Sequence, residues 1–73
     1  MEIGANMRPA EAWAELRELA ERTLSDPTIH MEGWWLAVWP FRKTAAKVLA
    51  EKIAKEQPES AAKAAELASL VTF

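Results

Sequence analysis

Four prolines divide the 73-residue chain into segments of helical length, at Pro9, Pro27, Pro40 and Pro58. Proline fits the first turn of a helix but disrupts a helix interior, because it has no N–H to donate and its ring clashes with the preceding turn. Each proline therefore marks the place where a helical segment begins or ends. The spacing predicts three helices, with a shorter segment of different character before Pro40.

The first predicted helix covers residues 7–24 and follows a flexible leader at residues 1–6, with Asn6 as its cap. Glu11 and Glu15 lie toward its positive end, which suits the helix dipole. Its apolar residues recur at the spacing of three and four that is typical of a buried helix face. We expect this face to contain Trp13, Leu16, Leu19, Ala20 and Leu24.

Two more helices are predicted at residues 40–56 and 58–71, because Gln57-Pro58 interrupts an otherwise continuous helical pattern. The inward-facing residues expected in the first of these are Phe41, Ala45, Val48, Leu49 and Ile53. The second has a buried stripe of small residues, Ala61, Ala64, Ala65 and Ala68. Since small residues permit a close approach, we expect the two helices to form an antiparallel helical hairpin.

Residues 28–39 can be interpreted in two ways. Thr28 to Met31 has some β preference, Glu32-Gly33 can turn, and the run from Trp34 to Trp39 is aromatic and aliphatic, so we expect a short β-hairpin or extended aromatic segment. However, glutamate is a poor first residue for the turns that hairpins favour, and no polar residue interrupts the run. The alternative is an apolar helix from Glu32 to Val38. The predicted class is therefore mostly α, or α+β if the hairpin forms.

The size and composition of the chain limit what it can do. Seventy-three residues make one small domain with a marginal core, and without cysteine no disulfide can support it. Association with another protein, or with itself as a homo-oligomer, remains as a source of stability. The N-terminus has no signal-peptide pattern, and no apolar run reaches the roughly 18–20 residues of a membrane span. We therefore expect a cytoplasmic location and no membrane span.

No pattern of catalytic or metal-binding residues is present. His30 is the single histidine, no serine stands in a nucleophile context, and two glycines cannot make a phosphate-binding loop. The glutamates of the first helix fit a solvated face. We expect a protein that is not an enzyme and has no cofactor or metal.

The aromatic run is the best candidate for a binding site. Tryptophan is enriched at the energetic centres of interfaces, although the same side chains also suit a core. Residues so close in sequence cannot all point the same way, so we expect at least one to be exposed. The predicted partner-binding residues are Trp34, Trp35, Trp39 and Phe41.

A second candidate is the basic group of Arg42, Lys43 and Lys47 at the start of the helix over 40–56. A helix N-terminus with added positive charge can bind an anion, and neighbouring tryptophans can stack on nucleic-acid bases. However, the net charge of −2 excludes the strongly basic balance of a general nucleic-acid binder. A small protein-interaction module (adaptor, inhibitor or regulatory subunit) is therefore the main prediction, with a nucleic-acid-associated regulator or a self-associating structural protein as alternatives.

Overall fold

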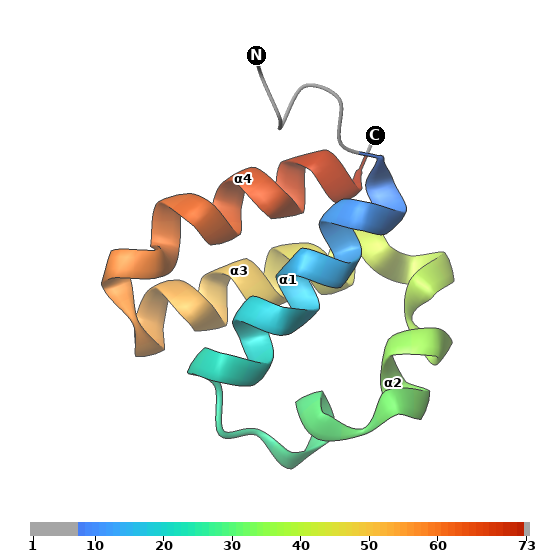
Figure 1. Ribbon diagram of the computed structural model, residues 1–73, viewed down its shortest axis with the longest axis horizontal. Helices are drawn as coiled ribbons and strands as arrows, with labels where there is room; N and C mark the ends of the chain where they lie inside the picture. Colours follow the sequence, from blue (N-terminus) through green and yellow to red (C-terminus); the bar gives the residue numbers. More distant parts are fainter. Residues whose placement is uncertain (1–7, 73) are drawn as a thin grey trace.

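The computed structural model describes residues 8–72, and within that range the chain forms four α-helices joined by short 3₁₀ turns (Figure 1). The predicted leader at residues 1–6 and the predicted cap Asn6 lie outside the described residues. The mostly helical class is confirmed, and residues 8–72 contain no strand. In chain order the elements are α1 (Pro9–Thr23), η2 (Pro27–His30), α2 (Glu32–Ala37), η3 (Trp39–Phe41), α3 (Arg42–Glu56), η4 (Pro58–Ser60) and α4 (Ala61–Val71).

Every proline occupies the first or second position of a helix or 3₁₀ turn, as the sequence predicts. Pro27 and Pro58 begin 3₁₀ turns and Pro40 is the second residue of one, so α3 and α4 start a few residues later than expected. At the start of α1 the backbone N–H of Arg8 donates to Glu11 Oε1 at 2.9 Å. This contact satisfies a donor that the first turn of a helix otherwise leaves free.

The hydrophobic core lies where α1, α3 and α4 meet, and α4 packs against both of the other helices (Figure 1). The predicted apolar face of α1 is confirmed, because all five of its residues are buried. The core also includes Ile29 from η2 and Trp35 from α2. The remaining buried hydrophobic residues are Ala12, Ala46, Leu49, Ile53, Ala64, Leu67 and Val71.

The predicted inner faces of α3 and α4 are only partly correct. Leu49 and Ile53 of α3 are buried, but Phe41 is 69% exposed and Val48 is also exposed. The residue that takes their place in the core is Ala46. The expected stripe on α3 is wider than the surface that covers it, so its edge toward α2 remains open. On α4 the pattern is similar, because Ala64 is buried whereas Ala65 is exposed.

The predicted β-hairpin or extended segment at residues 28–39 is wrong. Asp26 accepts a hydrogen bond from the backbone N–H of Thr28 at 2.9 Å, and Pro27 opens the 3₁₀ turn η2 that this contact caps. The alternative, an apolar helix over about Glu32 to Val38, corresponds to α2. In a helix adjacent residues point in different directions, so a run with no polar residue can still divide between core and surface.

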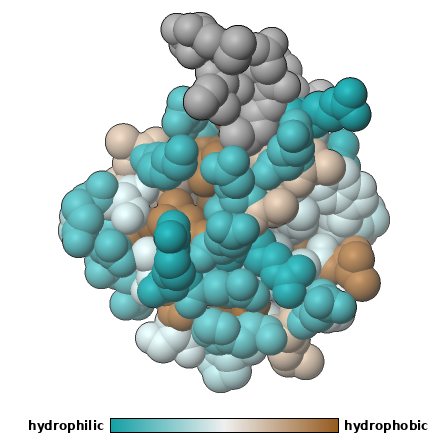
Figure 2. All heavy atoms as spheres, viewed as in Figure 1, coloured by the Kyte–Doolittle hydropathy of each residue, from teal (hydrophilic) through white to brown (hydrophobic). Residues whose placement is uncertain are grey.

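Among residues 8–72, no helix combines the length and the apolarity needed to cross a bilayer. The face of the molecule in Figure 2 is largely hydrophilic, with separate hydrophobic patches between the polar side chains. Around α2 the tryptophan side chains pack against the core and determine the local surface.

Candidate functional site

Trp35 is the centre of the tryptophan cluster. Its indole Nε1–H donates to the carbonyl oxygen of Ile29 at 2.6 Å, and its side chain is only 2% exposed. Its ring makes edge-to-face contacts with Trp13, at 5.2 Å between centroids, and with Trp34, at 4.9 Å. Such pairs add stability beyond the area they bury. Trp35 therefore fixes α2 against α1 and η2, and can support an interface only indirectly.

A groove lies between α1 and the segment that contains α2 and η3. We call it the tryptophan groove, and its volume is about 550 Å³. Trp13 contacts Trp35 and also Trp39, with 6.1 Å between the ring centroids of Trp13 and Trp39. Trp39 thus lies beside the first half of α1. The lining residues are Ala10, Trp13, Ala14, Arg17, Glu18, Glu21, Trp35, Leu36 and Trp39.

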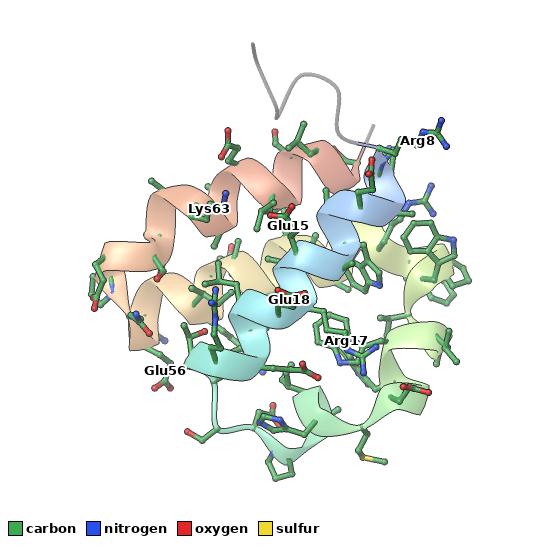
Figure 3. The ribbon with its side chains drawn as sticks, viewed as in Figure 1. Arg8, Glu15, Arg17, Glu18, Glu56 and Lys63 are labelled. Atoms are coloured by element: carbon green, nitrogen blue, oxygen red, sulfur yellow. The ribbon has the colours of Figure 1, made fainter. Side chains whose placement is uncertain are left out.

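One end of the tryptophan groove is acidic. Figure 3 shows Arg17 extending from α1 toward α2, where its guanidinium lies 5.6 Å from the ring centroid of Trp35. Arg17 also pairs with Glu21 at 3.2 Å and with Glu32 at 3.7 Å. Glu18 also lines the groove. Three carboxylates therefore stand against the one cation Arg17, which pairs with two of them, and the net charge of this set is negative.

The other end of the groove is covered by Arg42. The Arg42 guanidinium lies over the Trp39 ring at 4.4 Å from its centroid, and its Nη1 donates to the Trp39 carbonyl oxygen at 3.2 Å. The Arg42 Nε atom is buried without a hydrogen-bond partner. Stacking on tryptophan is favourable for a guanidinium, because the ring face carries negative charge density. Arg42 is thus used to hold Trp39 in place.

A second groove lies on the opposite side of α2, against α3, and we call it the Phe41 groove. Its volume is about 320 Å³, and most of its lining is apolar: Ile29, Trp34, Val38, Phe41, Ala45, Val48 and Leu49, together with Asp26, Thr28, Thr44 and Lys52. Its charged residues form one ion pair, Lys52 Nζ to Asp26 Oδ2 at 3.3 Å. The backbone N–H of Thr28, and then Lys52, lower the pKa of Asp26 below its usual value. The charges of this groove therefore balance.

The four residues predicted to bind a partner do not form one surface. Trp34 and Phe41 line the Phe41 groove, whereas Trp35 and Trp39 line the tryptophan groove. None of the four tryptophans is fully exposed, in contrast to expectation, and Trp34 and Trp39 are half-buried. Sequence reasoning missed Leu36, which is 73% exposed. The helical alternative for this segment contained the signal, because consecutive residues of α2 point to different sides.

The predicted basic group is also divided. Arg42 is directed to Trp39, whereas Lys43 and Lys47 line a hollow between α3 and α4. That hollow also contains Glu51, which reduces its positive charge. The three residues are therefore not brought together as a single anion-binding surface.

Residues 8–72 contain no group of three histidine, cysteine, aspartate or glutamate side chains placed to hold a metal. His30 is exposed, and its Nε2 lies 3.4 Å from the carbonyl oxygen of Leu24. The chemistry that this part of the chain does offer is apolar and aromatic contact, with carboxylates at one edge.

No protein-family model matches this chain, and neither a curated protein nor a solved structure gives a match. The two grooves therefore carry the functional information of the described residues, through their exposed apolar side chains, their half-buried tryptophans and their distribution of charge.

Proposed function

We propose that this protein is a non-enzymatic interaction module, an adaptor, inhibitor or regulatory subunit, that docks onto another protein through residues 31–41. One observation carries the proposal. Three large apolar side chains of this short segment are exposed: Met31 at 61%, Leu36 at 73% and Phe41 at 69%. Exposed apolar surface beside a groove often marks an interaction site.

The exposed side chains stand beside pockets that are suited to binding. Leu36 forms a wall of the tryptophan groove, and Phe41 forms a wall of the Phe41 groove. Moving one such side chain fully out of water stabilises a complex by about 1.5–3 kcal/mol. Trp34 and Trp39, half-buried beside them, add rigid aromatic surface that loses little entropy on binding. We propose that the module acts in the cytoplasm.

Self-association is the second candidate, and the Phe41 groove favours it. Phe41 stands beside an apolar groove without net charge, so a second copy can place its own Phe41 there. A two-fold axis would make the exchange reciprocal, as in most homodimers. The nucleic-acid alternative has less support, because Arg42 stacks on Trp39 whereas Lys43 and Lys47 line the hollow between α3 and α4.

Photo-cross-linking tests the proposal. A benzophenone amino acid would replace Leu36 in one variant and Phe41 in another, and the control variant would carry it at Ala62, an exposed residue of α4. We expect covalent adducts of defined mass from positions 36 or 41 in living cells, and none from position 62. Light scattering on the unmodified protein would distinguish a partner from a second copy.

Two results would contradict the proposal. One is an adduct pattern that is the same from all three positions, which would indicate random collision. The other is the absence of any adduct from positions 36 and 41 while circular dichroism shows both variants folded. Serine at either position provides a second check, since Leu36→Ser or Phe41→Ser should reduce cross-linking from the neighbouring position with folding intact.

A further inference from the structure

The tryptophan groove has the length and the direction of a helix. On α1 its lining extends from Ala10 to Glu21, which corresponds to about 16 Å at the helical rise per residue. Opposite α1 the chain of α2 and η3 runs in reverse, because Glu32 lies near Arg17 whereas Trp39 lies near Trp13. The groove therefore has α1 on one side and Trp35, Leu36 and Trp39 on the other, and about three turns of helix would match the length of its α1 wall.

The backbone of the groove walls offers nothing to an extended peptide. Its lining residues belong to α1, α2 and η3, so no edge of a β-strand faces the groove. A bound segment therefore cannot add a strand to this surface, and it must satisfy its own backbone N–H and C=O groups. A helix does so internally and presents one apolar stripe to the trough.

The charges at the groove's edge determine the polarity of the occupant. Glu21 and Glu32 pair with the cation Arg17, the Arg17–Glu32 contact is long at 3.7 Å, and Glu18 also lines the groove. A lysine or arginine of an incoming segment would meet excess carboxylate there, whereas a glutamate would be repelled. At the other end Trp13 and Trp39 form the floor, and the only nearby charge among the described residues is the Arg42 guanidinium stacked on Trp39.

We propose that the tryptophan groove binds an amphipathic helical segment of a partner protein. The apolar stripe of this bound helix lies against Leu36, Trp13 and Trp39, and the lysines or arginines of the bound helix meet Glu18 and Glu32. The inference rests on the proposed interaction function and specifies the class of its partner. Arg17 stays stacked on Trp35 and paired with Glu21, so the groove needs no rearrangement apart from its contact with Glu32.

Charge exchange between peptide and groove tests the inference. The probe is a fluorescein-labelled, end-capped peptide of about 16 residues, with leucines at helical spacing and lysines beside them. Its match carries glutamate in place of every lysine. Fluorescence anisotropy at low salt should show that the unaltered protein binds the lysine peptide about ten-fold more tightly than the glutamate peptide.

The protein variants locate the effect. Glu18→Lys combined with Glu32→Lys should reverse the preference between the two peptides. The matched control, Glu15→Lys combined with Glu66→Lys, makes the same change in net charge at exposed residues outside the groove lining, and should keep the preference for the lysine peptide. Leu36→Ser should weaken binding of the lysine peptide about ten-fold, because it removes apolar contact at the wall.

Several outcomes would overturn the inference. Equal affinity of the unaltered protein for the two peptides would do so. A reversal of the peptide preference by the control substitutions at Glu15 and Glu66, as large as that caused by the substitutions at Glu18 and Glu32, would do so as well. The absence of binding of either peptide at a protein concentration of about 1 mM, the weak end of the usual affinity range, would also contradict the inference. A dimer in solution that Leu36→Ser disrupts would assign the groove to a second copy. In each case cross-linking from positions 36 and 41 still tests the interaction function separately.

Discussion

The two grooves lie on opposite sides of α2, a helix of only six residues, and they differ in what they contain. The tryptophan groove has aromatic rings on its floor, two stacked arginines and an acidic edge. The Phe41 groove is mainly apolar, and its one ion pair leaves it without net charge. Adjacent residues of α2 line different grooves, because Trp34 lines the Phe41 groove and Trp35 lines the tryptophan groove.

This difference shows how a short helix can turn one aromatic run into two distinct surfaces. Trp35 is buried at the base of α2, and the residues beside it project outward on each side. Both grooves therefore depend on where Trp35 holds α2, whereas each groove has its own charged residues. Substitutions can remove the shared support, or change one groove and leave the other unaltered.

The largest effect is expected from Trp35→Ala, which removes the shared support. It eliminates two edge-to-face contacts and the hydrogen bond to Ile29, and it leaves a cavity in the core. Substitutions of this kind cost about 3–5 kcal/mol, a large part of the stability of a small domain. Urea unfolding followed by circular dichroism would measure the loss. A loss no larger than that caused by Trp34→Ala, where the ring is half-buried, would show that Trp35 does not support α2.

Arg42→Ala should affect the tryptophan groove alone. It removes the guanidinium stacked on Trp39 and the hydrogen bond to the Trp39 carbonyl, at a cost of about 0.5–1 kcal/mol for a partly exposed site. The neighbouring variant Lys43→Ala, at an exposed position, serves as the control and should change stability little. NMR shifts should change at Trp39 and Trp13 but not at Val48. Equal effects of the two variants, or shifts in both grooves, would contradict the separation of the grooves.

Gly33→Ala should make α2 more rigid, and with it the wall that the two grooves share. A Cβ atom at Gly33 meets no atom within 4 Å, and the residue does not adopt a positive φ. Replacement should therefore stabilise the fold by about 0.4–1 kcal/mol, because it reduces the entropy of the unfolded chain. Thermal unfolding would show a higher Tm, and amide exchange in α2 should become slower. A lower Tm would mean that α2 depends on flexibility at Gly33.

The smallest effect is expected at the ion pair beside the Phe41 groove. Contacts with Thr28 and Lys52 lower the pKa of Asp26 in the folded protein, so its ionised form favours folding. This contribution is present above the usual pKa of an aspartate and is lost as pH falls through the lowered value. Asp26→Asn should therefore be slightly less stable at pH 7, and the difference from the unaltered protein should shrink in acid. Urea titrations at several pH values would measure it.

Lys52→Met separates the two causes of that shift. It removes the ion pair but keeps the hydrogen bond from Thr28, which makes the larger contribution to the lowered pKa. Asp26 should therefore keep part of its acid dependence in this variant. For the Asp26→Asn variant, a difference in stability from the unaltered protein that grows as the pH falls would contradict the lowered pKa of Asp26.

The sequence predicts the helices that are long and periodic. In α1 polar and apolar residues alternate at helical spacing, so its buried face from Trp13 to Leu24 could be identified without coordinates. The prolines mark the starts of segments for a covalent reason that tertiary packing does not change. Both kinds of evidence are local, and the fold agrees with them.

The surfaces around α2 could not be predicted in the same way. The run from Trp34 to Trp39 has no polar residue to set a period, so strand and helix fit it equally well. The deciding contacts are the Asp26 cap, which starts η2, and the Trp35 hydrogen bond to Ile29. The exposure of Phe41 and Val48 depends on how far α2 lies from α3, which is a tertiary property. The predicted site residues all lie in this segment, and their division between two grooves could not be predicted.

The pairing of α1 with α4 has a consequence for the order of folding. These helices stand at opposite ends of the described chain, yet they pack against each other in the core. Such contacts need a long loop to close, which costs chain entropy before any burial rewards it, whereas α3 and α4 are close in sequence. We therefore expect α3 and α4 to associate first and α1 to dock late. Folding rates should then fall more for Leu67→Ala than for Leu19→Ala, and stopped-flow measurements of both variants would show whether they do.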